Sequence, residues 1–338
     1  MSRLGWILAG AATAAVAPAV IRQANALQQA DPECRKPLTW IPLPIVTMVK
    51  LRKAGLPVLG EVPIGTGIEH RSEIVPGVDG APDVPVELYR RSGLDGPLPG
   101  LLWIHGGGYV IGSAVGDHAI CSMFATEVDV QIVSVEYRLA PEHPFPAGLD
   151  DCFTALTWMI DNAERLGVDP ERVVIGGASA GGGLAAAALT QRAHDAGLTI
   201  TFQWLIYPML DDRAVQRAEN NNEWTLVWTP PANRYGWTSY LNAEPGTGEP
   251  PPYAAPGRRA DLAGLPPAWI GVGSIDLFHD EDVDYAKRLR AAGVPCELHV
   301  PPGMPHGMNA AAQDATVSKA FNAAALAALA RAVSGPGA

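Results

Sequence analysis

A short apolar run that ends in a serine among small residues constrains this chain more than any other feature. The run Val173–Ile175 leads into Gly177-Ala178-Ser179-Ala180-Gly181, and an alanine-rich stretch from Leu184 to Ala196 follows, with Gly197 at its end. This order predicts a buried strand, a sharp turn and a helix. The five residues fit G-x-S-x-G, in which a strained strand-to-helix corner exposes the serine hydroxyl above a sheet. Small residues around a serine are also common in chains rich in alanine and glycine, so the motif needs support from elsewhere.

The composition excludes several classes of function. Of 338 residues, 35 are Asp or Glu and 24 are Lys or Arg, which gives a formal net charge of −11. Nucleic acids and anionic membrane surfaces require a basic face, so neither is expected as a partner. Metal-binding, phosphate-binding and dinucleotide-binding motifs are absent from the sequence, and we expect no cofactor and no metal. The cysteines lack the spacing of a zinc site or a disulfide framework and are predicted to be buried thiols, at positions Cys34, Cys121, Cys152 and Cys296.

Eight short runs predict the strands of one sheet. Glu69–Val75 and Val84–Arg90 alternate between apolar and polar residues and are predicted to form an antiparallel edge. The other six runs lack this alternation, which is typical of strands buried on both faces of a mostly parallel sheet. They are Leu101–Ile104, Gln131–Tyr137, Arg172–Ile175, Phe202–Tyr207, Ala268–Val272 and Glu297–Val300.

Helical patterns separate these strands. One helix is predicted from a stripe of apolar residues, a second from near Asp280 to Gly293, and a third from Thr316 to Val333. Asp280 and Asp282 suit the first turn of the second helix, where negative charge is favoured. The residues of the apolar stripe are Leu149, Phe153, Leu156, Ile160 and Ala163.

The first 26 residues allow two interpretations. An apolar run from Leu4 to Val20 precedes Ala24-Asn25-Ala26, which has the form of a signal-peptide cleavage site. Pro18 interrupts the run and alanine makes it weakly hydrophobic, so we favour an uncleaved helix and a cytoplasmic protein. Export with cleavage near Ala26 is the alternative. The run is short for a permanent membrane span, and none is expected.

A long segment from about residue 210 to residue 267 breaks the alternation of strands and helices. It follows the carboxyl end of a predicted strand, where ligands bind in parallel sheets, and we expect it to roof a pocket. A pair of helices that only stabilises the fold is the alternative interpretation. The aromatic residues of this segment are Trp224, Trp228, Tyr235, Trp237 and Tyr240.

Ser179 requires a base, because a serine hydroxyl is a poor nucleophile near neutral pH. His306 lies in a loop rich in turn residues just beyond the strand that ends at Val300, and from there it can reach a neighbouring strand end. His299 lies within that strand and His279 beside the acidic start of a helix. We therefore predict His306 as the base.

The base in turn requires a carboxylate to orient it. Asp276 follows directly on the strand Ala268–Val272, whereas Asp280 and Asp282 are already assigned to the first turn of a helix. Asp276 is therefore the predicted acid. The resulting chain order of Ser, Asp and His is the one that this sheet topology gives.

A glycine-rich loop supplies candidate donors for the oxyanion, beside the predicted nucleophile, base and acid. His105-Gly106-Gly107-Gly108-Tyr109 follows the strand Leu101–Ile104. Successive glycines let backbone N–H groups converge on one oxygen, as a tetrahedral oxyanion requires. The predicted donors are the N–H groups of Gly107, Gly108 and Ala180, and His105 is predicted to hold the loop without transferring protons.

These motifs resemble those of the hormone-sensitive-lipase family of α/β-hydrolases, from about residue 45 to the C-terminus. The resemblance rests on His105–Gly108, Gly177–Gly181, Asp276, His306-Gly307 and the long block Tyr137–Ala147, which our reading of strands and turns does not explain. Two positions differ from the common family pattern: Ala178 precedes the serine, and Leu277-Phe278-His279 follows the acid.

The resemblance implies an α/β fold with an eight-stranded, mostly parallel sheet and a helical cap. The cap would comprise residues 27–60 and the insertion at about 210–267, and the hydrolase domain would span residues 61–338. The implied activity is hydrolysis of short- to medium-chain carboxylic esters, with a small-molecule ester as partner and a homodimer left open. An amidase or lactonase on the same residues and a non-catalytic small-molecule receptor of the same fold are the alternatives.

Overall fold

The computed structural model describes residues 24–36, 44–56, 63–184, 189–220 and 225–334. The predicted signal-like segment lies almost entirely outside the described residues. Its last three residues, Ala24 to Ala26, belong to a helical stretch over 24–29, in which Ala26 and Leu27 are buried. Within the described ranges, no helix combines the length and the apolar character needed to cross a membrane.

The described residues form one eight-stranded sheet in the order β1-β2-β4-β3-β5-β6-β7-β8. β1 pairs with β2 and β2 with β4 in antiparallel fashion, and all other neighbours are parallel. The predicted antiparallel edge and the mostly parallel sheet are thus confirmed. The strands are β1 Ile68–Val75, β2 Val84–Arg91, β3 Leu98–Ile104, β4 Gln131–Val135, β5 Val168–Ala178, β6 Phe202–Ile206, β7 Ala268–Gly271 and β8 Cys296–His299.

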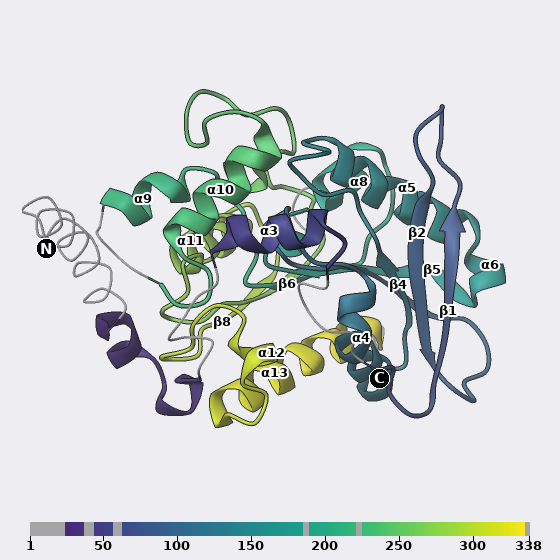
Figure 1. Ribbon diagram of the computed structural model, residues 1–338. Coiled ribbons are helices and arrows are strands. Elements are labelled where there is room, and N and C mark those ends of the chain that lie inside the picture. Colours follow the sequence, from purple (N-terminus) through teal and green to yellow (C-terminus); the bar gives the residue numbers. More distant parts are fainter. Residues whose placement is uncertain (1–23, 37–43, 57–62, 185–188, 221–224, 335–338) are drawn as a thin grey trace, which may run out of the picture.

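Helices pack on both faces of the sheet (Figure 1). α4 and α13 bury one side of the core, and α5, α8 and α11 bury the other. The helices are α3 Ile45–Lys53, α4 His118–Glu127, α5 Ala147–Asp161, α6 Ala163–Leu166, α7 Ala180–Gly182, α8 Thr190–Asp195, α9 Ala214–Asn220, α10 Pro230–Leu241, α11 His279–Ala291, α12 Met308–Ala311 and α13 Thr316–Val333. Short 3₁₀ turns are η1 Pro32–Cys34, η2 Val115–Asp117 and η4 Pro256–Arg258.

The predicted helix boundaries need two corrections. The apolar stripe placed Ala163 in one helix with Leu149, but α5 ends at Asp161 and Ala163 begins the separate α6. The helix predicted from Leu184 begins earlier, because the chain turns into α7 directly after Ser179. Part of its predicted course, residues 185–188, lies outside the described residues.

The block Tyr137–Ala147 connects the sheet to the elements above it. The backbone N–H and the guanidinium of Arg138 bind both carboxylate oxygens of Asp151 in α5, at 2.8–3.0 Å. Glu142 forms ion pairs with Arg52 and Lys53 of α3 at 2.6 and 2.9 Å. Arg138 and Glu142 thus have structural roles within a sequence block that strands and turns alone did not explain.

Asp151 should be critical for stability, since its carboxylate is buried and accepts the bonds from the backbone N–H and the guanidinium of Arg138. Replacing Asp151 by alanine should lower the free energy of unfolding by about 2–4 kcal/mol, because the Arg138 charge loses its partner in a mostly buried place. The exposed pair of Arg331 with Glu297 provides the control, and Arg331→Ala should cost about 1 kcal/mol or less. Urea denaturation of both variants measures the difference, and equal losses would contradict the assignment.

Candidate active site

Ser179 lies at the corner between β5 and α7 in a strained backbone conformation. Its φ is 57° and its ψ is −122°, outside the regions that non-glycine residues favour. Its N–H donates to the carbonyl of Ile206 in the neighbouring strand at 2.9 Å. The corner needs glycine beside it, because a Cβ at Gly181 would lie 2.1 Å from the carbonyl oxygen of Ile104.

His306 lies between Ser179 and Asp276, although these residues are far apart in the chain. Its Nε2 is 3.0 Å from Ser179 Oγ, and its Nδ1 is 2.8 Å from Asp276 Oδ2. The second carboxylate oxygen of Asp276 accepts the N–H of Phe278 at 2.9 Å. Because a carboxylate only accepts, Nδ1 carries the ring proton and Nε2 is free to accept the serine proton. The structure therefore brings the three predicted residues into one hydrogen-bonded series.

Aromatic side chains surround the imidazole of His306. The rings of Tyr207 and Phe278 meet it edge to face at 4.6 and 5.1 Å, and the Trp228 ring lies at 6.5 Å. Tyr207 is itself fixed, since its hydroxyl donates to Asn309 Oδ1 at 2.8 Å. Phe278 stands at one of the positions that depart from the family pattern, and here it packs against the histidine.

The glycine-rich loop after β3 lies next to Ser179. Gly107 and Gly108 have positive φ values of 123° and 61°. A Cβ at Gly107 would lie 2.0 Å from the Ile111 carbonyl oxygen, and one at Gly108 would lie 2.1 Å from the Trp228 ring. Among the described residues, the N–H groups of Gly107 and Gly108 have no protein acceptor. Ala180 is the first residue of α7, whose N–H has no acceptor within the helix.

His105 supports this loop. Its ring stacks on Tyr137 at 4.3 Å, and its Nδ1 donates to the carbonyl of Gly106 at 2.8 Å. Burial lowers the pKa of His105 to about 4, so the ring is neutral near pH 7. The geometry agrees with the predicted structural role.

Glu136 anchors the far end of the same loop. Its carboxylate accepts the N–H of Ala114 at 2.6 Å. Burial raises the pKa of Glu136 to about 7, with the Ala114 bond opposing that shift. This residue titrates near neutrality at the base of the oxyanion loop, and the sequence analysis did not identify it.

The first turn of α11 contains a second feature that the sequence analysis missed. The Glu281 carboxylate accepts the backbone N–H groups of Leu210 and Asp211 at 2.7 and 3.2 Å and pairs with Arg217 at 3.3 Å. It thereby fixes the point where the insertion leaves the sheet. The helical spacing of Phe278, Glu281 and Tyr285 was the available signal, because these side chains share the buried face.

Asp282 lies in the first turn of α11, as predicted, but inside the protein. Its side chain is fully buried and forms no hydrogen bond among the described residues. Burial raises the pKa of Asp282 well above its usual range, with the nearby Glu281 and Asp276 acting in the same direction.

The other candidates weighed as acid or base lie elsewhere. Asp280 is exposed and binds His279 Nδ1 at 2.8 Å. His299 lies in β8, where its ring stacks on Trp269.

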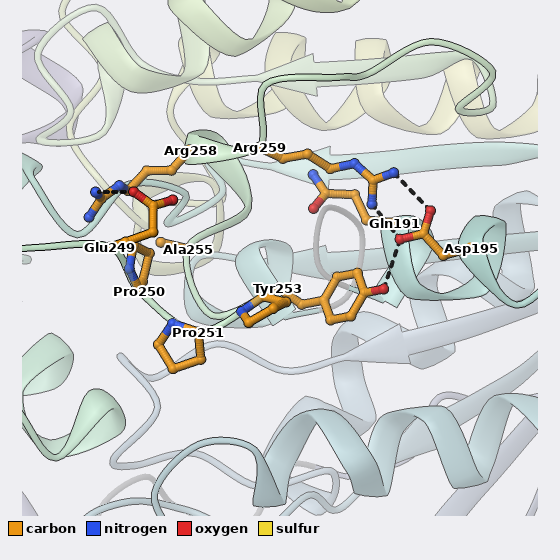
Figure 2. A pocket seen from close by; sticks show the side chains of 10 residues that line it. Gln191, Asp195, Glu249, Pro250, Pro251, Tyr253, Ala255, Arg258 and Arg259 are labelled. Atoms are coloured by element: carbon orange, nitrogen blue, oxygen red, sulfur yellow. Dashed lines mark hydrogen bonds and ion pairs between the residues drawn. The ribbon is translucent and has the colours of Figure 1, made fainter.

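A cavity of about 240 Å³ opens at a different place, between α8 and the loop before η4 (Figure 2). It shares no residue with the groups around Ser179. Its charged side chains already pair with one another: Arg259 binds Asp195, and Arg258 binds Glu249. Across the described ranges, no three His, Cys, Asp or Glu side chains are arranged to hold a metal ion.

Comparisons with known proteins place the chain in a family. Residues 101–310 match the family described as an alpha/beta hydrolase fold. The carboxylesterase NlhH of Mycobacterium tuberculosis is 38% identical over 243 residues, which cover 68% of this chain and 73% of the relative. The ethyl acetate hydrolase of Pseudomonas putida is 34% identical over 226 residues, covering 66% of this chain and 70% of the relative.

Solved structures show the same likeness over a larger share of the chain. A bacterial heroin esterase superposes with a TM-score of 0.81 at 38% identity, covering 90% of this chain and 98% of that one. The esterase LipW from Mycobacterium marinum superposes with a TM-score of 0.76 at 34% identity, covering 91% of this chain and 97% of that one.

The raised pKa of Glu136 predicts a pH effect on stability. The folded state holds the proton of Glu136 up to about pH 7, whereas the unfolded chain releases it near its ordinary pKa of 4.5. The free energy of unfolding therefore falls as the pH rises from the lower to the higher of these two values. Glu136→Gln keeps an acceptor for Ala114 but cannot titrate. Its free energy of unfolding should therefore fall less than that of the wild type between pH 5 and pH 8. Parallel losses in urea denaturation at the two pH values would show that Glu136 does not titrate in this range.

Proposed function

The chain belongs to the hormone-sensitive-lipase-like family of α/β-hydrolases and is a carboxylic ester hydrolase, and from this premise we propose that it acts through a triad of Ser179, His306 and Asp276 on short- to medium-chain acyl esters. The observation that carries the proposal is the hydrogen-bonded series from Ser179 Oγ through the imidazole to the Asp276 carboxylate. A serine next to a histidine without an orienting acid would lack the tautomer that general-base catalysis needs.

In the first half of the reaction, Ser179 Oγ attacks the ester carbonyl carbon while His306 Nε2 takes the hydroxyl proton. The carbonyl π electrons move onto oxygen, and the N–H groups of Gly107, Gly108 and Ala180 stabilise that oxyanion. The oxyanion then collapses, the C–O bond to the alcohol breaks, and His306 gives its proton to the leaving oxygen. An acyl group remains on Ser179.

In the second half, a water molecule attacks the acyl-enzyme and gives its proton to His306 Nε2. Collapse of the new tetrahedral intermediate releases the carboxylic acid and returns the proton to Ser179. Asp276 stays ionised and stabilises the imidazolium that forms twice in each cycle. Loss of one oxyanion donor typically lowers turnover by about 10²–10³.

The surroundings of the serine support small, apolar acyl groups. Ser179 and His306 are each only 6% exposed, and aromatic rings enclose the histidine. The ring of Trp228 lies directly over Gly108. These contacts leave little open surface beside the nucleophile, which favours short chains over long ones.

Hydrolysis of p-nitrophenyl esters from acetate to palmitate tests the proposal. Ser179→Ala should lower kcat by about 10⁴ or more, because the members of a triad act as a unit. The wild type should show its highest kcat/KM at short chain lengths. Ser72→Ala, at a serine on the distant strand β1, is the control and should retain activity.

Two results would count against the proposal. If Ser179→Ala retained turnover within tenfold of the wild type, Ser179 would not be the nucleophile. A maximum at palmitate would contradict the short-chain preference while leaving the triad intact.

A further inference from the structure

The inner face of α10 packs directly on the oxyanion loop. A Cβ at Gly236 would lie 2.8 Å from the carbonyl oxygen of Gly108. One turn further along, the Tyr240 ring stacks on Tyr109 at 4.1 Å, and the Trp237 ring lies 5.3 Å from the same tyrosine. Side chains on this face of α10 are therefore close neighbours of the proposed oxyanion donors.

Asn233 lies on this face and is fully buried. Its Oδ1 is 3.3 Å from the indole Nε1 of Trp228. An indole N–H can only donate, so the amide oxygen must face Trp228 and the amide nitrogen must face elsewhere. Within the described part of the chain, this Nδ2 has no acceptor.

The Nε1 of Trp237, one turn along the helix, is a second buried donor without an acceptor among the described residues. A buried N–H without an acceptor costs stability, and native proteins keep few of them. Two such donors on one turn of one helix mark a place where a bound molecule could supply the acceptor that the described residues do not.

Trp228 contacts both Asn233 and the oxyanion loop beside Ser179. The benzene part of its indole lies against Gly108, and its pyrrole N–H binds Asn233. A substrate held at Ser179 would reach the amide of Asn233 only where its acyl or alcohol part extends past the indole.

We propose that Asn233 Nδ2 donates a hydrogen bond to a second oxygen of the substrate, so that the enzyme prefers esters carrying an ether, carbonyl or hydroxyl oxygen a few atoms from the scissile carbonyl. This inference rests on the proposed function and names its substrate class. Asn233 takes no part in the chemical step and acts as a specificity-determining residue. An aliphatic chain in the same position would leave the buried donor unpaired, which is a strong basis for discrimination.

An oxygen scan of the substrate tests this directly. In the acyl series, p-nitrophenyl hexanoate is compared with analogues in which oxygen replaces the methylene at carbon 3, 4 or 5. In the alcohol series, hexyl acetate is compared with the corresponding ethers. Each kcat/KM is divided by the rate constant for hydroxide-catalysed hydrolysis, which removes the inductive effect of the added oxygen.

In the wild type, one oxygen position in one of the two series should raise the corrected kcat/KM by about three- to tenfold over the aliphatic parent, the range expected for one hydrogen bond. The series that responds identifies the side of the substrate that Asn233 contacts. Asn233→Leu should abolish this preference, which is read as the ratio of the corrected kcat/KM for the oxygen analogue to that for the aliphatic parent within the same variant. Asn233→Asp, which keeps an oxygen for Trp228, should also lose it. Thr238→Val, on the exposed face of the same helix, is the control and should keep it.

The possible results distinguish the inference about Asn233 from the proposed esterase function. A flat profile in both series would overturn the inference while leaving the esterase in place, and this needs only the wild type. A preference that survives in both Asn233 variants would also overturn it. Failure to hydrolyse any ester, the aliphatic parents included, would instead overturn the proposed function together with the inference.

Discussion

The strained corner at Ser179 is the constraint on which the rest of the site depends. A non-glycine residue at φ 57° and ψ −122° costs about 1–3 kcal/mol and persists only where its surroundings fix it. The Ile206 carbonyl holds the serine N–H, and the serine carbonyl accepts from Gly183 and Met209 at 3.0 and 2.9 Å. These bonds hold the strained backbone of Ser179 in the conformation that places its hydroxyl 3.0 Å from His306 Nε2.

Buried acids hold the loops around this corner. Glu136 anchors the oxyanion loop, Glu281 fixes the start of the insertion, and Asp151 holds the block after β4 through Arg138. Each carboxylate binds backbone N–H groups of a different segment, which ties loops to helices without requiring apolar contact. The glycine-rich loop, the insertion and the block after β4 are thus held by carboxylates that take no part in the chemistry.

The sequence predicted the sheet and the three central residues because both depend on local patterns. Short apolar runs mark buried strands, and Ser179, Asp276 and His306 each follow such a run. The partners of buried polar groups depend instead on contacts between distant segments. Helical spacing could have placed Glu281 on the buried face with Phe278 and Tyr285, but the sequence did not show that its partners are the N–H groups of Leu210 and Asp211. The donor of Asn233 was hidden for the same reason, since only the folded chain shows that its amide nitrogen lacks an acceptor.

Covalent labelling tests the central claim most directly. The protein is treated with diethyl p-nitrophenyl phosphate, and the adduct is located by peptide mass spectrometry. The account predicts one diethylphosphoryl group per chain on Ser179, with release of one equivalent of nitrophenolate and loss of esterase activity in proportion to labelling. Full inactivation with the label on another residue, or full activity after complete labelling of Ser179, would contradict it.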